Sequence, residues 1–173
     1  MRKNWLTLHL CLAGLFLPFF ITIPLSGTFY LLGNKGSIKR SLAFSVAEPF
    51  TKDRQKIEGY LKANDTDFDF EYIKDRKTRL VLRPATRDHY EVVKTDLGMD
   101  FVKVELDWIR VLQELHFGHG PRLIKNLQIA FGIGFMLVVI SGFFLMIGLK
   151  KQVPIFFGSL GLGFAVFLLG FLI

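Results

Sequence analysis

Three long stretches of the chain contain no charged side chain. They are Asn4–Asn34, Asn126–Leu149 and Gln152–Ile173. A helix needs about 20 apolar residues to cross a bilayer core that is roughly 30 Å thick. Each stretch reaches that length, so the pattern predicts three transmembrane helices. Their expected bounds are residues 5–32, 123–149 and 153–173.

The segment between the first two stretches, residues 33–122, changes its hydrophobic period along its length. Apolar residues at helical spacing predict a helix over Glu48–Ala63, with Pro49 in its first turn, and another over Trp108–Leu115. Between them, apolar and polar residues alternate as in half-buried strands. The segment is therefore predicted to be a small α+β domain, an antiparallel meander of three or four strands with the first helix on one face. The strands are expected at residues 68–73, 80–82, 90–93 and 101–106.

The first apolar stretch also resembles the start of a secretory signal, because Arg2 and Lys3 precede it. A signal has an apolar region of about 7–15 residues followed by a small-x-small cleavage site. This stretch is about twice as long, and its best candidate site, around Leu25-Ser26-Gly27, has a bulky leucine at the −3 position. We therefore favour a retained helix over a cleaved signal.

Charge sets the expected orientation and excludes one class of partner. The short clusters Arg2–Lys3 and Lys150–Lys151 contain four of the 22 basic residues and none of the 15 acidic ones. By the positive-inside rule, residues 1–4 and 150–152 are expected in the cytoplasm and residues 33–122 outside it. The formal net charge of +7 leaves only +3 for the stretch Lys35–Lys125, which is not the footprint of a nucleic-acid-binding protein.

Four short motifs occur in order near the ends of the first two predicted helices. They are Leu8-His9-Leu10 with Gly14, Pro24-Leu25-Ser26-Gly27-Thr28, Glu114-Leu115-His116-Phe117-Gly118 and Ile140-Ser141-Gly142. Their order and spacing resemble the PepSY-associated transmembrane family over most of the chain, to about Leu149. The resemblance implies a bacterial inner-membrane protein with a periplasmic PepSY-like domain.

What else the resemblance implies depends on the size of the family member. Larger members resemble haem-containing reductases linked to iron uptake, and PepSY domains elsewhere are thought to inhibit or chaperone peptidases. This chain has one external domain, three predicted helices and no recognisable flavin or nicotinamide domain. The resemblance therefore does not extend to a complete reductase.

The histidines are the candidates for chemistry. His9 lies a few residues inside the first predicted helix, where an ionisable group is costly and is usually functional or paired. Neutral imidazole also ligates haem, so His9 is a candidate ligand of haem b, with contact to interfacial water or head groups as the alternative. His116 is expected at the opposite face of the bilayer, so a second axial ligand would come from another copy or a partner subunit.

His116 and His119 lie three residues apart and form a candidate metal site, although a structural site needs more than two ligands. Gly118 and Gly120 favour the alternative, a break in the helix that positions the domain. Cys11 is the only cysteine, which excludes an intramolecular disulfide and any metal cluster that requires several thiolates.

Small residues in the last two predicted helices indicate close helix packing. Their four-residue spacing lets helix backbones approach closely. The packing partner is either the other helix of this pair or another chain. The candidate residues are Gly134, Ser159, Gly161, Gly163 and Ala165.

No catalytic constellation is recognisable in the sequence. We therefore expect an accessory or regulatory inner-membrane protein that lies in the lipid bilayer and presents its domain to a membrane or periplasmic partner, or to a second copy. One alternative is a haem-binding electron-transfer subunit of a metal-reducing or respiratory system. The other is an inhibitor or chaperone of a periplasmic peptidase.

Overall fold

The structure, a computed structural model, describes residues 2–172. Met1 and Ile173, which belong to the predicted first and last segments, lie outside the described residues. The chain divides into two compact units. One contains the residues up to Leu17 and those from Ala130 onward, and the other contains Pro18–Ile129.

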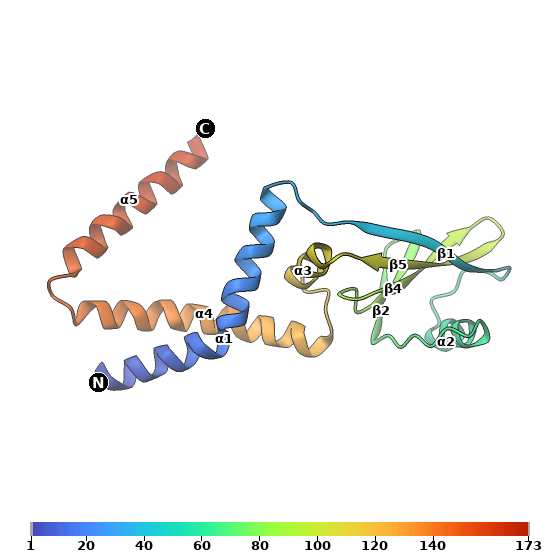
Figure 1. The fold of residues 1–173 in the computed structure, drawn as a ribbon, viewed down its shortest axis with the longest axis horizontal. Coiled ribbons are helices and arrows are strands. Elements are labelled where there is room, and N and C mark those ends of the chain that lie inside the picture. Colours follow the sequence, from blue (N-terminus) through green and yellow to red (C-terminus); the bar gives the residue numbers. More distant parts are fainter. Residues whose placement is uncertain (1, 173) are drawn as a thin grey trace. The chain divides into compact units, whose positions relative to one another are not determined.

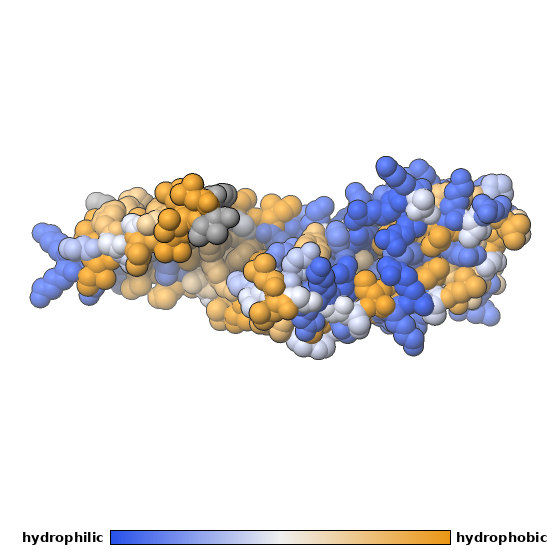
Figure 2. All heavy atoms as spheres, turned by 90° about the horizontal axis from the view of Figure 1, so that it is seen from above, coloured by the Kyte–Doolittle hydropathy of each residue, from blue (hydrophilic) through white to orange (hydrophobic). Residues whose placement is uncertain are grey.

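Three helices are long and apolar enough, by length and composition, to cross a bilayer. They are α1 (Arg2–Leu31), α4 (Arg122–Ile147) and α5 (Val153–Leu172) (Figure 1). Hydrophobic surface gathers over these helices, and hydrophilic surface over the part of the chain that contains the sheet (Figure 2). The structure confirms three long apolar helices and a separate antiparallel sheet with helices of its own.

The N-terminal half of α1 packs against α4 through aromatic rings and one glycine. Trp5 stacks on Phe144 with ring centroids 4.8 Å apart, and Phe16 meets Phe131 edge-on at 5.8 Å. A Cβ atom on Gly134 would collide with the Phe16 ring. The absence of a side chain at this position therefore permits the contact, as small residues do between membrane helices.

The second unit contains a five-stranded antiparallel sheet in the order β1-β5-β4-β3-β2. Helix α2 (Arg54–Ala63) lies on one face, where Ile57 and Leu61 join the buried core. The strands are β1 (Ile38–Val46), β2 (Tyr72–Asp75), β3 (Arg79–Arg83), β4 (His89–Thr95) and β5 (Gly98–Leu106) (Figure 1). The rest of the core consists of Phe70, Leu80, Leu82, Val92, Met99 and Phe101. We call Ile38–His116 the sheet domain.

The prediction of the first helix of this domain is wrong at its start. The helix begins at Arg54 rather than at Glu48, and Pro49 lies in the irregular segment before it. Asp53 marks the start, because its side chain accepts a hydrogen bond from the Gln55 amide at 2.9 Å and so satisfies a free helix donor.

The prediction of three or four strands is also wrong. Ile38–Val46 forms a fifth strand, β1, at the edge of the sheet beside β5. The strand expected from Phe68 begins only at Tyr72. Phe68 and Phe70 pack on the core from an irregular segment, whereas the polar residues beside them do not join it. This produces a strand-like alternation in a segment that is not a strand.

The chain enters and leaves the sheet domain at neighbouring positions. Ile38 of β1 pairs with Leu106 of β5, and helix α3 (Trp108–His116) follows directly. Asp107 caps α3 by accepting from the Arg110 amide at 2.7 Å. The Asp107 carboxylate also accepts from the amide and the hydroxyl of Ser37, at 2.7 and 3.0 Å. These hydrogen bonds of Asp107 join the two ends of the sheet to the start of α3. Helix α3 lies beside the sheet face opposite α2.

Candidate functional site

A pocket of about 300 Å³ lies on the sheet face opposite α2. Successive side chains of a strand point to opposite faces. Along β3, Leu80 and Leu82 therefore enter the core, while Arg79, Val81 and Arg83 line the pocket. Helix α3 and the residues that follow it supply the opposite wall.

The lining of this pocket is strongly cationic. Five arginines and two glutamates give it a formal net charge of +3 when its histidines are neutral. We call it the arginine pocket. Its arginines are Arg40 of β1, Arg76 of the β2–β3 turn, Arg79 and Arg83 of β3, and Arg110 of α3, and its glutamates are Glu91 and Glu114.

Glu91 is shared by two arginines. Its Oε2 atom lies 3.2 Å from Nη1 of Arg79 and 3.5 Å from Nε of Arg40. The glutamate is buried, whereas the two arginine side chains are nearly half exposed. One carboxylate on β4 therefore holds two guanidinium groups at the mouth of the pocket.

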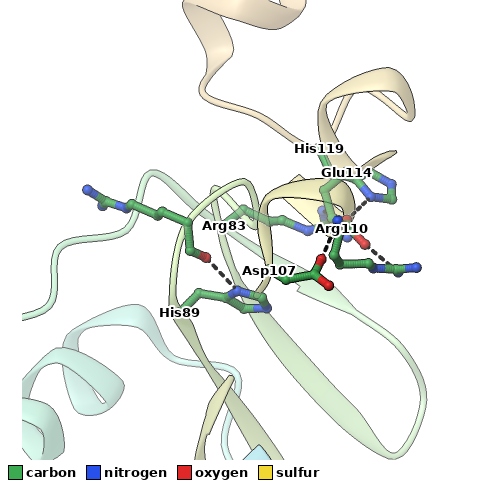
Figure 3. Close-up of polar contacts among 7 residues, drawn as sticks. Arg83, His89, Asp107, Arg110, Glu114 and His119 are labelled. Atoms are coloured by element: carbon green, nitrogen blue, oxygen red, sulfur yellow. Dashed lines mark hydrogen bonds and ion pairs between the residues drawn. The ribbon is translucent and has the colours of Figure 1, made fainter. Parts of the chain in front are cut away.

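Glu114 is shared by three basic groups (Figure 3). Arg110 lies one turn earlier on α3, and its Nη2 atom donates to Oε1 of Glu114 at 2.5 Å. Oε2 accepts from Nδ1 of His119 at 2.6 Å and lies 3.5 Å from Nη1 of Arg83. The backbone amide of His119 also donates to the Glu114 carbonyl at 2.9 Å, which fixes the histidine just beyond the helix end.

Arg83 is the most buried arginine of the pocket, with 4% of its surface exposed. Burial lowers the pKa of its guanidinium, and the neighbouring Glu114 charge opposes this effect. Its Nε and Nη1 atoms have no hydrogen-bond partner among the residues that the structure describes. The 3.5 Å approach to Glu114 is an ion pair rather than a hydrogen bond. Because buried polar groups are normally hydrogen-bonded, the pocket is short of acceptors at this residue.

The geometry and the surroundings favour a carboxylate at Glu114 and a neutral imidazole at His119 near neutral pH. Burial raises the pKa of Glu114, but the His119 hydrogen bond and the charges of Arg110 and Arg83 outweigh it, so the pKa is lowered. Burial lowers the pKa of His119, although Glu114 opposes the change. The neutral His119 ring therefore donates its Nδ1–H to the carboxylate.

His89 is a further buried histidine of the pocket, and the sequence alone assigns it no role. It is 4% exposed, and its Nδ1 atom donates to the carbonyl of Arg87 at 2.9 Å. Burial lowers the pKa of His89, and the charge of Arg83 acts in the same direction. His89 is the first residue of β4 and pairs with Val104. Its position in the strand places it on the pocket face, but only the strand order shows what surrounds it.

The structure does not bring the imidazoles of His116 and His119 to a common partner. Nδ1 of His116 lies 2.8 Å from the Ser26 hydroxyl of α1, whereas Nδ1 of His119 binds Glu114. Between Arg2 and Leu172, no group of three or more histidine, cysteine, aspartate or glutamate side chains is arranged to hold a metal ion. His116 links α3 to α1, and His119 belongs to the arginine pocket.

His9 forms a polar pair with α4. Its Nδ1 atom lies 3.0 Å from the hydroxyl of Ser141, which is fully buried and also donates to the Val138 carbonyl. The ring lies close to Gly142, because a Cβ atom there would be 3.6 Å from its Cε1. These surroundings fit a hydrogen bond between two packed helices better than one face of a haem. Haem ligation by His9 stays a prediction.

The predicted small-residue contact between α4 and α5 does not form among the described residues. Gly134 faces Phe16 of α1 instead. Apart from the neighbouring residues and nearby backbone of α5 itself, no atom described in the structure lies within 4 Å of where a Cβ atom would stand on Gly161 or Gly163. Ser159 and Ala165 are likewise exposed. Association of this face of α5 with another chain stays a prediction.

Comparisons with known proteins add no relative: no protein-family model, no curated protein and no solved structure matches the chain. The likeness to the PepSY-associated transmembrane family therefore depends on the sequence motifs alone. It stays a prediction about the chain rather than its classification.

Proposed function

We propose that this chain is an accessory or regulatory protein of a bacterial inner membrane that presents a PepSY-like domain to a periplasmic or membrane partner. Its three helices are long and apolar enough to anchor it in a bilayer. The basic clusters Arg2–Lys3 and Lys150–Lys151 favour an orientation with the sheet domain on the periplasmic side.

The observation that carries the proposal is the donor-rich arginine pocket. Arg83 is buried there with two nitrogen atoms that no described residue satisfies. Its guanidinium is held close to Glu114, which Arg110 and His119 also bind. A site whose side chains are already held in position loses little conformational entropy when it binds. The pocket is therefore suited to recognition of an acidic group on a partner.

Haem-linked electron transfer is not our proposal, because Ser141 is a sufficient partner for His9. A reduced-minus-oxidised visible spectrum of the purified protein and of a His9→Ala variant tests that prediction. Inhibition or chaperoning of a peptidase remains one identity of the partner that the experiment below would reveal.

Site-specific cross-linking in native membranes tests the proposal. A photoreactive benzoylphenylalanine in place of Leu42 lies on the pocket face of β1, two residues from Arg40, and Leu42 is 63% exposed. The control places the same group at Lys56, an exposed residue of α2 on the opposite face. We expect a defined adduct from position 42 that is absent from position 56. Equal adducts at both positions, or none at either, would contradict the proposal.

A further inference from the structure

We propose that the arginine pocket binds a phosphate-type oxyanion, either free phosphate or the phosphate monoester of a lipid head group, with Arg83 as its central donor. The inference deepens the proposed binding role of the sheet domain, because it names the chemistry that the pocket recognises.

Two arginines of the same pocket have buried donors that are unsatisfied among the described residues. Nε and Nη1 of Arg83 and Nε of Arg110 are buried without a hydrogen-bond partner among the residues described. Both side chains line the pocket. No described carboxylate forms an ion pair with Arg76, which is exposed and lines the same pocket. An entering oxyanion would supply acceptors to the donors that Glu91 and Glu114 leave unsatisfied.

The charge balance favours a phosphate group over a single carboxylate. Glu91 and Glu114 each contact more than one basic group, and the pocket still has a formal net charge of +3. A phosphate monoester carries about −1.5 to −2 at neutral pH, whereas a carboxylate carries one charge. A phosphate therefore neutralises more of the excess.

The directions from which the arginine side chains enter the pocket also favour a phosphate group over a carboxylate. The arginines come from β1, the β2–β3 turn, β3 and α3, so their donors enter from different elements. A carboxylate presents two oxygens in one plane, which a single guanidinium group can match. A tetrahedral oxyanion presents oxygens in several directions. Val81, Ala85 and Val104 add apolar walls that strengthen charge interactions by excluding water.

The chain path makes a lipid head group one available source. His119 lies three residues before Arg122, the first residue of α4, so the two are separated by about 10 Å at most. Pocket residue Phe117 also contacts Tyr30 in the last turn of α1, with ring centroids 6.2 Å apart. The pocket therefore lies next to the ends of two helices that are long and apolar enough to span a bilayer.

The test uses the full-length protein in nanodiscs of zwitterionic phosphatidylcholine. Inorganic phosphate and acetate are titrated at constant ionic strength, and binding is followed by isothermal calorimetry. A second arm replaces part of the phosphatidylcholine with phosphatidic acid and measures the resulting shift in unfolding temperature. The variants are Arg83→Lys, which keeps the charge but loses the fork, and Arg76→Gln, which removes an exposed charge. Lys56→Gln on α2 is the matched control for net charge.

We expect phosphate to bind more tightly than acetate, and each pocket variant to weaken that binding about tenfold or more, with no change in Lys56→Gln. Stabilisation by phosphatidic acid that Arg83→Lys removes, without binding of inorganic phosphate, identifies the lipid source and supports the inference. Acetate binding equal to phosphate, equal loss in Lys56→Gln, or no response in either arm overturns it. A partner adduct at position 42 with no response in either the phosphate or the phosphatidic acid arm would reject the inference alone. A response in one of these arms without an adduct would reject the proposed function alone.

Discussion

Oε2 of Glu114 accepts a hydrogen bond from Nδ1 of His119 across 2.6 Å, and this contact joins helix α3 to the segment that leads into α4. The same carboxylate binds Arg110 and approaches Arg83. It is the one group described in the structure that contacts both walls of the arginine pocket through ion pairs.

Replacing Glu114 with glutamine should destabilise the sheet domain. The substitution leaves the buried Arg83 without its counter-charge, and loss of one partner from a buried pair costs roughly 3 kcal/mol. The free energy of unfolding can be measured by chemical denaturation followed by circular dichroism. The matched control is Glu58→Gln, which removes an exposed i,i+4 pair with Arg54 and should cost about 0.5 kcal/mol or less. Equal losses in the two variants would contradict the assigned role of Glu114.

The sheet domain should lose stability as the pH falls below about 6.5. Burial holds the pKa of His89 below its ordinary value of 6.5 in the folded protein, while Glu91 and Glu114 oppose the effect and Arg83 adds to it. The unfolded chain therefore binds the proton more tightly. The stabilisation is fully present above the ordinary pKa and is lost as the pH falls toward the folded-state pKa.

Unfolding free energies measured between pH 7.5 and 5 test this dependence. His89→Gln should flatten the profile in that range, and His119→Gln should flatten it further because burial also lowers the pKa of His119. The lowered pKa of Glu114 affects stability only at more acidic pH, near the ordinary range of a glutamate. An unchanged slope in both histidine variants would show that neither group is responsible.

Two glycine-to-alanine substitutions should separate a packed helix face from an open one. In Gly134→Ala the new methyl group collides with the Phe16 ring, and overpacking of this kind costs about 1–3 kcal/mol. In Gly161→Ala no described atom outside the nearby part of α5 itself lies within 4 Å of the new methyl group, so we expect a change within about 0.5 kcal/mol. Unfolding in mixed detergent and SDS measures both. A large loss in Gly161→Ala would indicate that another chain packs on α5.

Cysteine labelling should report the orientation of the chain. In a Cys11→Ser background, Lys56→Cys should react with a membrane-impermeant maleimide in intact cells, because the sheet domain is proposed to be periplasmic. Lys151→Cys lies in the short basic connection between α4 and α5 and should react only after the inner membrane is permeabilised. The reverse pattern would place the sheet domain in the cytoplasm.

The long helices could be predicted because each depends on one local property, a run of apolar residues long enough to cross a bilayer. Strand β1 could not. Lys39 and Arg40 are adjacent, and a register shift between Leu42 and Phe44 interrupts the alternation that identifies a strand. Most residues on both faces of β1 are exposed, so the strand has no regular alternation of apolar and polar residues that would identify it.

The arginine pocket could not be predicted from the sequence for a different reason. Arg40, Arg79 and Arg110 lie far apart in the sequence and meet only because β1 pairs with β5 rather than with β2. One local signal was available. Arg79 and Arg83 alternate with Leu80 and Leu82, which indicates a strand whose second face carries charge. The sequence does not show that α3 would cover that face and bury Arg83.

The hydrogen bonds between Ser37 and Asp107 hold together the two segments of chain by which the sheet is entered and left. The first and last strands of the sheet pair at Ile38 and Leu106, so the sheet begins and ends at nearly the same point in the fold. Domains whose ends lie close together can be inserted into a host chain with little disturbance of the host. Here the flanking segments of the chain are the two apolar helices α1 and α4. The sheet domain could therefore be replaced by another domain with adjacent ends, in evolution or by design, while the apolar helices stay the same.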